Sequence, residues 1–293
     1  MPVFLIALGK LFNQSESIFI KSYNKKHAKG NLVFSGLISL FIMLFFLVTD
    51  LITDETGITF NPKIFIYAII AGVSYATAYV TTCLALKEGS FVLTGLVISY
   101  SVLVTVIQGL ILGESLKILG WIGLILILCS LYLVKGDDKG DTVKVTKKWL
   151  IYVIIDFIAA GLCGIMARQQ QLDFQAITGV KGIYDNEYMI ATLGISALIL
   201  LTIGFIKERK DSAYILRHGT LYAMGVGVSN GACNLLTLYV YTLLPMSVIA
   251  PLCSGFGILI SFLFAKLIYH EKFTVLQYIG VVLGAIALIL FNI

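Results

Sequence analysis

LILGESLKILGWIGLIL at residues 110–126 and LIYHEKFTVLQYIGVVL at residues 267–283 decide the fold of this chain, because the two segments align with each other without a gap. Upstream, the tripeptide Gly-Val-Ser at residues 72–74 also matches residues 227–229, once two extra residues are allowed in the later loop. Self-similarity at a long, fixed interval is the sequence signature of repeated structural units. The chain therefore contains two copies of one unit.

The composition excludes a soluble protein. Of the 293 residues, 59% are hydrophobic and only 13% are charged, whereas about a quarter of the residues in a soluble domain are charged. Apolar runs of nearly twenty residues recur along the chain, and each is long enough to cross the roughly 30 Å hydrocarbon layer as a helix. We therefore expect an all-α integral membrane protein that crosses the cell membrane many times and has the lipid bilayer as its partner.

Ten apolar runs separated by polar or turn-rich breaks predict ten transmembrane helices. We place them at residues 3–21, 32–49, 63–86, 90–112, 117–134, 149–168, 187–206, 215–241, 246–269 and 274–292. The first run is the least hydrophobic, because Lys10 and the polar residues 13–17 interrupt it. The alternative is that this run lies on the membrane surface as an amphipathic helix and that nine helices span.

A polar, charged linker at residues 136–148 divides the chain nearly in half. The first repeat, residues 1–135, and the second, residues 149–293, then hold five helices each. Because five is odd, the second copy enters the membrane from the opposite side, so the two five-helix repeats have inverted topology. Secondary transporters commonly follow this plan and bind their substrate near the membrane midplane, between the repeats.

The distribution of basic residues predicts the orientation, since cytoplasmic loops carry an excess of Lys and Arg. Of the 21 Lys and Arg residues, 16 lie in or beside the loops on one side. These loop regions are residues 21–29, 87, 135–148, 207–217 and 266–272. We therefore expect a cytoplasmic linker and both termini outside.

Several short motifs resemble the EamA domain of the drug/metabolite transporter superfamily. The first half has ALKEGS at residues 85–90, LGES at 112–115 and LGWIG at 119–123, while the second half repeats the pattern with HEK at 270–272 and Gly280. The resemblance covers nearly the whole chain as two tandem EamA domains. It implies a ten-helix secondary transporter with a central cavity, of a kind that often exports amino acids, other small metabolites or drugs.

Three ionisable residues lie well within predicted spans: Lys10, Glu16 and Asp156. A charged side chain in hydrocarbon costs about 2.5–3.5 kcal/mol on insertion scales and so usually faces a cavity or a partner. Helix-length arithmetic places Lys10 and Asp156 near the midplane. Our hypothesis is that Lys10 forms an ion pair with Asp156 or Glu16 that substrate or protons rearrange; the alternative is a permanent structural pair.

The first predicted helix carries a polar stripe, because Lys10, Asn13 and Gln14 follow i, i+3, i+4 spacing and Glu16 flanks Asn13. Such a stripe should not face lipid. One interpretation is that the stripe forms the wall of a substrate cavity. The alternatives are the polar face of an amphipathic helix on the membrane surface, or polar contacts that hold helices together.

Two further polar ladders occupy equivalent positions in the repeats. Tyr75 and Tyr79 lie on the third helix, and Asn230 and Asn234 lie on the eighth. Tyrosine rings can bound an organic solute or a cation, and Asn amides can bond polar groups of either sign. We expect the ladders to line a cavity; the alternative is hydrogen bonding between helices within the bundle.

The remaining features specify no chemistry. The segment at residues 169–187 reads as an outer loop or a short surface helix. The five cysteines and three histidines are scattered, so we expect no metal, cofactor or catalytic residue. The net charge of +5 comes from basic residues spread over short loops, so we expect no nucleic-acid partner.

The sequence therefore predicts a secondary transporter and not an enzyme. We expect it to move a small polar or zwitterionic organic metabolite, amino acid-like or drug-like, by alternating access, with export favoured over uptake. Two alternatives stay open: a membrane-embedded enzyme acting on lipid, and a membrane partner protein that transports nothing. Homodimer formation also stays open.

Overall fold

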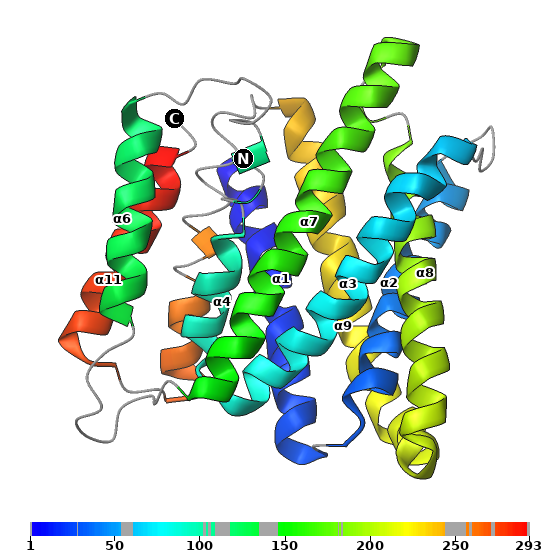
Figure 1. Ribbon diagram of the computed structural model, residues 1–293, viewed down its shortest axis with the longest axis horizontal. Coiled ribbons are helices and arrows are strands. Elements are labelled where there is room, and N and C mark those ends of the chain that lie inside the picture. The colour runs from blue at the N-terminus through cyan, green and yellow to red at the C-terminus, as the bar shows by residue number, and fades with distance from the viewer. Residues whose placement is uncertain are drawn as a thin grey trace.

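The computed structural model is a bundle of α-helices (Figure 1). It describes residues 2–27, 29–53, 61–101, 104, 107–108, 118–134, 146–180, 182, 184–243, 256–257, 260–270 and 273–291. Every regular element within these ranges is helical. The predicted all-α class is thus confirmed for the described part of the chain.

The helices coincide with the predicted apolar runs. They are α1 (Pro2–Lys26), α2 (Asn31–Thr53), α3 (Pro62–Glu88), α4 (Phe91–Ser99), α6 (Ile118–Val134), α7 (Lys147–Thr178), α8 (Asp185–Lys207), α9 (Arg209–Leu243) and α11 (Val275–Phe291). Within the described residues, α1, α2, α3, α7 and α8 are long and apolar enough to cross a membrane. The chain is a membrane protein.

Local capping explains where several helices begin. Pro62 is the first residue of α3, and Asn61 caps the helix. The Asn61 side chain accepts a hydrogen bond from the backbone N–H of Lys63 at 3.0 Å. Thr146 caps α7 in the same way, accepting from the N–H of Trp149 at 3.1 Å. These caps satisfy backbone donors that have no partner within the helix.

The start of α2 takes its cap from another part of the chain. The Glu208 carboxylate, in the turn between α8 and α9, accepts from the backbone N–H groups of Leu32 at 3.1 Å and Val33 at 2.9 Å. A carboxylate at a helix N-terminus is favoured by the helix dipole. This contact ties the α1–α2 turn to the α8–α9 turn at one end of the bundle.

The helices of the two halves interleave rather than forming two separate bundles. α1 packs against α9 and α3, α7 packs against α3 and α4, α2 packs against α8 and α9, and α6 pairs with α11. α1 and α7 run in opposite directions (Figure 1). Because α1 lies within the bundle, the alternative of a surface-lying first helix is wrong.

Close approach at two of these crossings requires glycine. A Cβ atom on Gly72 of α3 would come within 2.9 Å of the Ile195 Cβ on α8, and one on Gly227 of α9 would come within 2.7 Å of the Phe41 Cβ on α2. Small residues let membrane helices pack with their backbones near each other. The two glycines that align between the repeats thus serve the same purpose.

Two helix ends differ from the sequence prediction. α7 continues to Thr178, so the expectation of a loop or short helix from residue 169 is wrong for residues 169–178. No glycine or proline interrupts that stretch, and the helix ends at Gly179, whose φ of 72° is easily adopted only by glycine. Within the predicted run 90–112, α4 is interrupted after Ser99, where the N–H groups of Tyr100 and Ser101 bond to carbonyls three residues back. Residues 104, 107 and 108 are helical again, and the other residues of this run beyond 101 lie outside the described part of the chain.

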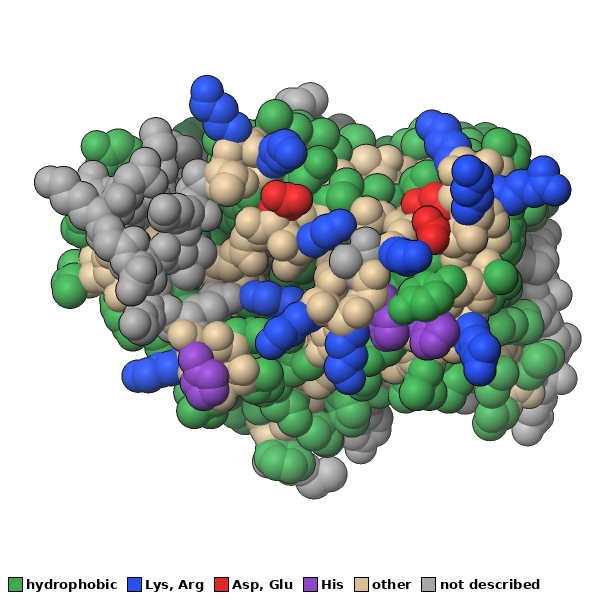
Figure 2. Space-filling model, turned by 90° about the horizontal axis from the view of Figure 1, so that it is seen from below, with side chains coloured by type: hydrophobic (Ala, Val, Ile, Leu, Met, Phe, Trp, Pro, Cys, Tyr) green, Lys and Arg blue, Asp and Glu red, His purple; other side chains and the backbone are tan. Residues whose placement is uncertain are grey.

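The two ends of the bundle differ in charge. Figure 2 shows one end covered by Lys and Arg side chains. Exposed residues there include Lys25, Lys26, Lys87, Lys147, Lys148, Lys207, Arg209, Lys210 and Arg217. α1 begins and α11 ends at the opposite end (Figure 1). The charge asymmetry expected from the sequence is therefore present as two distinct faces.

Candidate functional site

Two carboxylates inside the bundle each accept a hydrogen bond from a neutral side chain. Asp156 on α7 is 1% exposed, and its Oδ2 accepts from the Thr82 hydroxyl on α3 at 2.5 Å. Glu16 on α1 accepts from the Asn230 amide on α9 at 3.2 Å. Each acid is thus held across a contact between helices from the two halves.

The two carboxylates belong to one region of the bundle. They are close enough for Glu16 to act electrostatically on Asp156. The Tyr79 hydroxyl lies within electrostatic range of both. Tyr75 stacks against Tyr79 with ring centroids 5.9 Å apart. The structure therefore brings together four of the predicted site residues, and Asn230 joins them through Glu16.

The expected ion pair is not formed. Within the described residues, neither Glu16 nor Asp156 has a Lys, Arg or His within salt-bridge distance, so the hypothesis of a pair with Lys10 is wrong for this conformation. The uncharged side chains of Thr82 and Asn230 donate hydrogen bonds to these two carboxylates instead. The Lys10 stem instead lies beside Gly257, 3.9 Å from the position of a Cβ there.

The other predicted residues fall on the same helices with less defined surroundings. Gln14 is buried on α1, and Asn13 is half-buried on the same helix. Asn234 lies on α9, but its side chain is outside the described part of the structure. These residues stay candidates by position alone.

One face of α7 extends from the central carboxylate toward the C-terminal end of that helix. Asp156, Cys163, Gln170 and Phe174 are buried on it at spacings that keep one helical face. Gln170 is 1% exposed, and neither its Nε2 nor its Oε1 has a hydrogen-bond partner in the described structure. A buried, unpaired amide is costly and needs an explanation.

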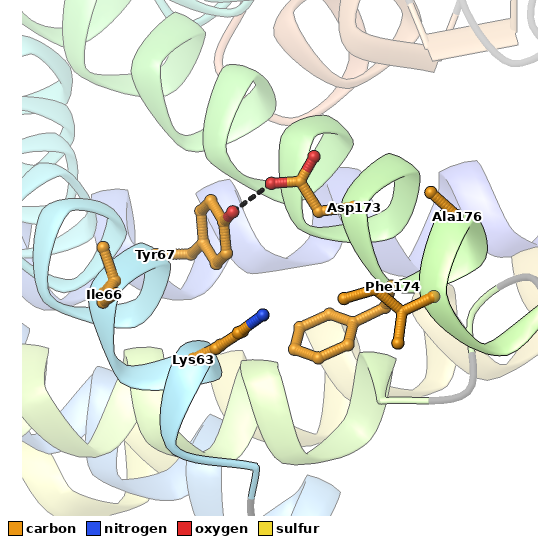
Figure 3. A pocket seen from close by; sticks show the side chains of 7 residues that line it. Lys63, Ile66, Tyr67, Asp173, Phe174 and Ala176 are labelled. Atoms are coloured by element: carbon orange, nitrogen blue, oxygen red, sulfur yellow. Dashed lines mark hydrogen bonds between the residues drawn. The ribbon is translucent and has the colours of Figure 1, made fainter.

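A pocket of about 460 Å³ lies near the C-terminal end of the same helix, between α3 and α7. Its lining residues are Lys63, Ile66, Tyr67, Asp173, Phe174, Ala176 and Ile177 (Figure 3). The Tyr67 hydroxyl donates to Asp173 Oδ2, and the Gln169 amide donates to Asp173 Oδ1 at 3.0 Å. The pocket therefore combines a positioned carboxylate with an ammonium and apolar walls.

The sequence analysis does not identify Gln170 or this pocket, because it expects an outer loop or a short surface helix from residue 169. The available signal was the i, i+4 spacing of Gln169 and Asp173 and of Gln170 and Phe174, in a stretch without helix breakers. Nothing in the sequence pairs Thr82 with Asp156. Among the described residues, no three His, Cys, Asp or Glu side chains cluster as a metal site.

The comparisons with known proteins agree with a membrane-transport architecture. A family model described as the EamA-like transporter family matches residues 147–293. The chain belongs to the EamA-like transporter family. A protein of known crystal structure, 14% identical in sequence, covers 97% of this EamA-like chain with a TM-score of 0.55, over 95% of its own length, and so shares the fold. The comparison with curated proteins finds no match.

Membership of this family implies that the EamA-like protein is a drug/metabolite transporter. The match covers the second half, which contains Asp156, Cys163, Gln170 and Asn230. Thus α7 and α9, which carry half of the central contacts, lie in the matched region, while Glu16 and the tyrosine ladder come from the first half.

Proposed function

We propose that this EamA-like protein is a secondary transporter that moves a small polar or zwitterionic organic metabolite, amino acid-like or drug-like, across the cell membrane by alternating access, with export favoured. The observation that carries the proposal is the pair of carboxylates, Glu16 and Asp156, held inside the bundle by neutral donors. Uncompensated acids inside a membrane protein mark ion, proton or substrate pathways.

The proposed architecture is two inverted five-helix repeats, residues 1–135 and 149–293, joined by a cytoplasmic linker at 136–148. The helix packing supports it. Exchanging α1 with α7, α2 with α8, α3 with α9 and α6 with α11 converts the α1–α9 contact into the α7–α3 contact and the α2–α9 contact into the α8–α3 contact. The α2–α8 and α6–α11 contacts map onto themselves, as expected for elements at a pseudo-twofold axis.

The basic end of the bundle supports a cytoplasmic assignment for the face in Figure 2. Both termini are then outside. In this orientation the pocket between α3 and α7 opens toward the outside, and the Glu208 contact between the two turns lies on the cytoplasmic side.

Neutral partners suit acids that must change state during transport. An ionised carboxylate fixed to a lysine would already be neutralised, whereas Asp156 and Glu16 can each take a proton or the ammonium group of a solute while keeping the bond to Thr82 or Asn230. Tyr75 and Tyr79 supply aromatic surface beside them, which suits an organic cation. Lys10, Asn13, Gln14 and Asn234 complete the proposed substrate-contacting set on α1 and α9.

Flux through proteoliposomes containing only this protein tests the proposal. With a panel of radiolabelled zwitterionic and polar metabolites, at least one compound should exchange faster than in protein-free liposomes. Glu16→Gln and Asp156→Asn keep side-chain size but remove the charge, and each should lower that flux at least about tenfold, equivalent to about 1.4 kcal/mol. Glu88→Gln, at the exposed end of α3, is the matched control and should leave it unchanged.

Two results would contradict the proposal. Flux equal to that of protein-free liposomes for the whole panel would favour a membrane partner protein or a lipid-acting enzyme. Flux that survives both substitutions would remove the carboxylates from the transport site.

A further inference from the structure

The outer pocket between α3 and α7 presents opposite charges on opposite walls. Lys63 belongs to the first turn of α3, and Asp173 belongs to the last turns of α7. Figure 3 shows the Lys63 side chain reaching from α3 toward Phe174, while the Tyr67 hydroxyl points to the Asp173 carboxylate. Within the described structure the two charged groups form no ion pair with each other or with another residue.

The carboxylate is held in place from two sides. Tyr67 of α3 donates to one oxygen of Asp173, and Gln169, one turn earlier on α7, donates to the other. Gln169 is itself bonded to the Gln108 amide at 3.2 Å, so the network spans three parts of the chain. A carboxylate has about four acceptor positions. Asp173 can therefore accept further donors from a ligand without losing its fixed orientation.

The rest of the pocket is apolar. Ile66, Ile177 and Ala176 line it, and the buried Phe174 ring forms its inner side. The Phe174 ring packs edge-on against the Tyr184 ring, with 4.9 Å between the ring centroids. The volume of about 460 Å³ falls within the range of small-molecule sites, about 300–1,000 Å³. One ammonium, one carboxylate and an apolar wall fit a small solute with two opposite charges and a hydrocarbon part.

The pocket and the central carboxylate lie along the same face of α7. Gln170, whose buried amide has no hydrogen-bond partner in the described structure, lies one turn from the pocket residue Phe174, about 6 Å along the helix axis. Asp156 lies fourteen residues further along the same face, about 21 Å away.

We propose that this pocket is an outer vestibule site that binds a small zwitterion, with Lys63 contacting its anionic group and Asp173 its cationic group. Phe174 separates this site from Gln170, which is the next polar group on the path to Glu16 and Asp156. The inference rests on the proposed transport function, because it assigns the vestibule to the same solute pathway.

Protection of an introduced cysteine tests binding directly. Ala176→Cys places a thiol on the pocket wall, and its reaction rate with a charged methanethiosulfonate reagent is measured on the full chain in lipid nanodiscs, after subtraction of the unsubstituted protein. Leu172→Cys is the matched control, because Leu172 is exposed on the same helix but does not line the pocket. The zwitterionic probes are L-leucine, L-phenylalanine and glycine betaine.

Truncated probes assign the two charges. Leucinamide lacks the carboxylate of L-leucine, and 4-methylpentanoate lacks its ammonium. L-leucine should protect Ala176→Cys at an at least tenfold lower concentration than either analogue, and should not protect Leu172→Cys. In the Ala176→Cys variant, the additional substitution Lys63→Met should abolish the preference for L-leucine over leucinamide and leave the preference over 4-methylpentanoate. The additional substitution Asp173→Asn should do the reverse.

The outcomes separate this inference from the proposed function. If none of the three zwitterions protects Ala176→Cys, or if Lys63→Met and Asp173→Asn leave both preferences intact, the vestibule site is wrong, even where Glu16→Gln still stops flux. Protection that depends on anionic lipid in the nanodisc and not on the zwitterion would assign Lys63 to a lipid headgroup and also overturn it. Conversely, protection that persists while flux survives Glu16→Gln and Asp156→Asn would overturn only the central site.

Discussion

The α1–α9 and α7–α3 crossings have the same place in the proposed repeat but different chemistry. At the first, Glu16 meets the Asn230 amide; at the second, Asp156 meets the Thr82 hydroxyl. Asp156 is buried, whereas Glu16 is half-buried. In the proposed repeat the two helices have equivalent neighbours but different side chains at the crossing. A nearly symmetric frame therefore surrounds an asymmetric pair of acids, which is what a solute with distinct ends requires.

The equivalent ends of α1 and α7 diverge further. α1 ends in Lys25 and Lys26 on the basic face, whereas the last turns of α7 carry Gln169 and Asp173. In the proposed inverted arrangement these ends lie on opposite sides of the membrane. The difference in charge between them then fits the proposed orientation, in which the basic end is cytoplasmic.

The largest expected effect concerns whether the two crossings act as one site. If Glu16 and Asp156 share one proton or one ammonium group, the double variant Glu16→Gln/Asp156→Asn should transport no worse than the worse single variant, with each single variant reduced at least about tenfold. Initial flux rates in proteoliposomes measure this. Reductions that multiply in the double variant would instead indicate two independent sites, one at each crossing.

A smaller effect is expected at the glycines that align between the halves. Gly72→Ala and Gly227→Ala each force a Cβ to within 3.0 Å of atoms on the neighbouring helix. Overpacking of this kind costs about 1–3 kcal/mol. Each variant should therefore lower the apparent Tm of the detergent-solubilised protein by several degrees, and by similar amounts if the crossings are structurally equivalent.

Gly9→Ala is the control for this measurement. A Cβ on Gly9 would lie 3.6 Å from the nearest atom, the Leu236 Cβ, which is an ordinary contact. Replacing a glycine inside a helix by alanine gains up to about 1 kcal/mol of helix propensity, and all three variants share this gain. The apparent Tm of Gly9→Ala should therefore equal that of the unsubstituted protein or rise by a few degrees. A lower apparent Tm for Gly72→Ala without a lower one for Gly227→Ala would show that the α3–α8 and α9–α2 crossings are not equivalent.

The sequence was sufficient for the helices but not for the contacts of their side chains. Hydrophobic runs bounded by caps such as Asn61 and Thr146 located most helices to within a few residues, because burial in lipid and capping are local properties. The sequence analysis ends this helix too early because residues 169–178 are too polar to belong to a membrane-spanning run, although they remain helical until Gly179. Local composition alone does not reveal a helix that extends beyond hydrocarbon.

The candidate site shows the same limit. Glu16 and Asp156 were recognised because charge in an apolar run is rare. Their partners were not, because the choice of Thr82 and Asn230 over Lys10 depends on how α1, α3, α7 and α9 cross. Those crossings join segments far apart in the sequence, and no local pattern shows which side chains meet there.

The smallest expected effect lies on the basic face, at the end of the α1–α9 crossing. Partial burial, followed by the nearby His218 and Lys26, lowers the pKa of His27 below its usual value of 6.5. Its Nδ1 lies 2.9 Å from the Tyr214 hydroxyl, and the neutral ring can accept a hydrogen bond from this hydroxyl. As pH falls below 6.5, the unfolded chain takes up a proton that the folded chain resists, so stability decreases. From pH 7.5 to 5.5, the apparent Tm should fall by about 1 °C more in the unsubstituted protein than in His27→Gln, since a solvent-exposed group is screened. Equal falls would show that His27 does not contribute to this contact, and an opposite difference would mean that its protonated form is the one bound at the crossing.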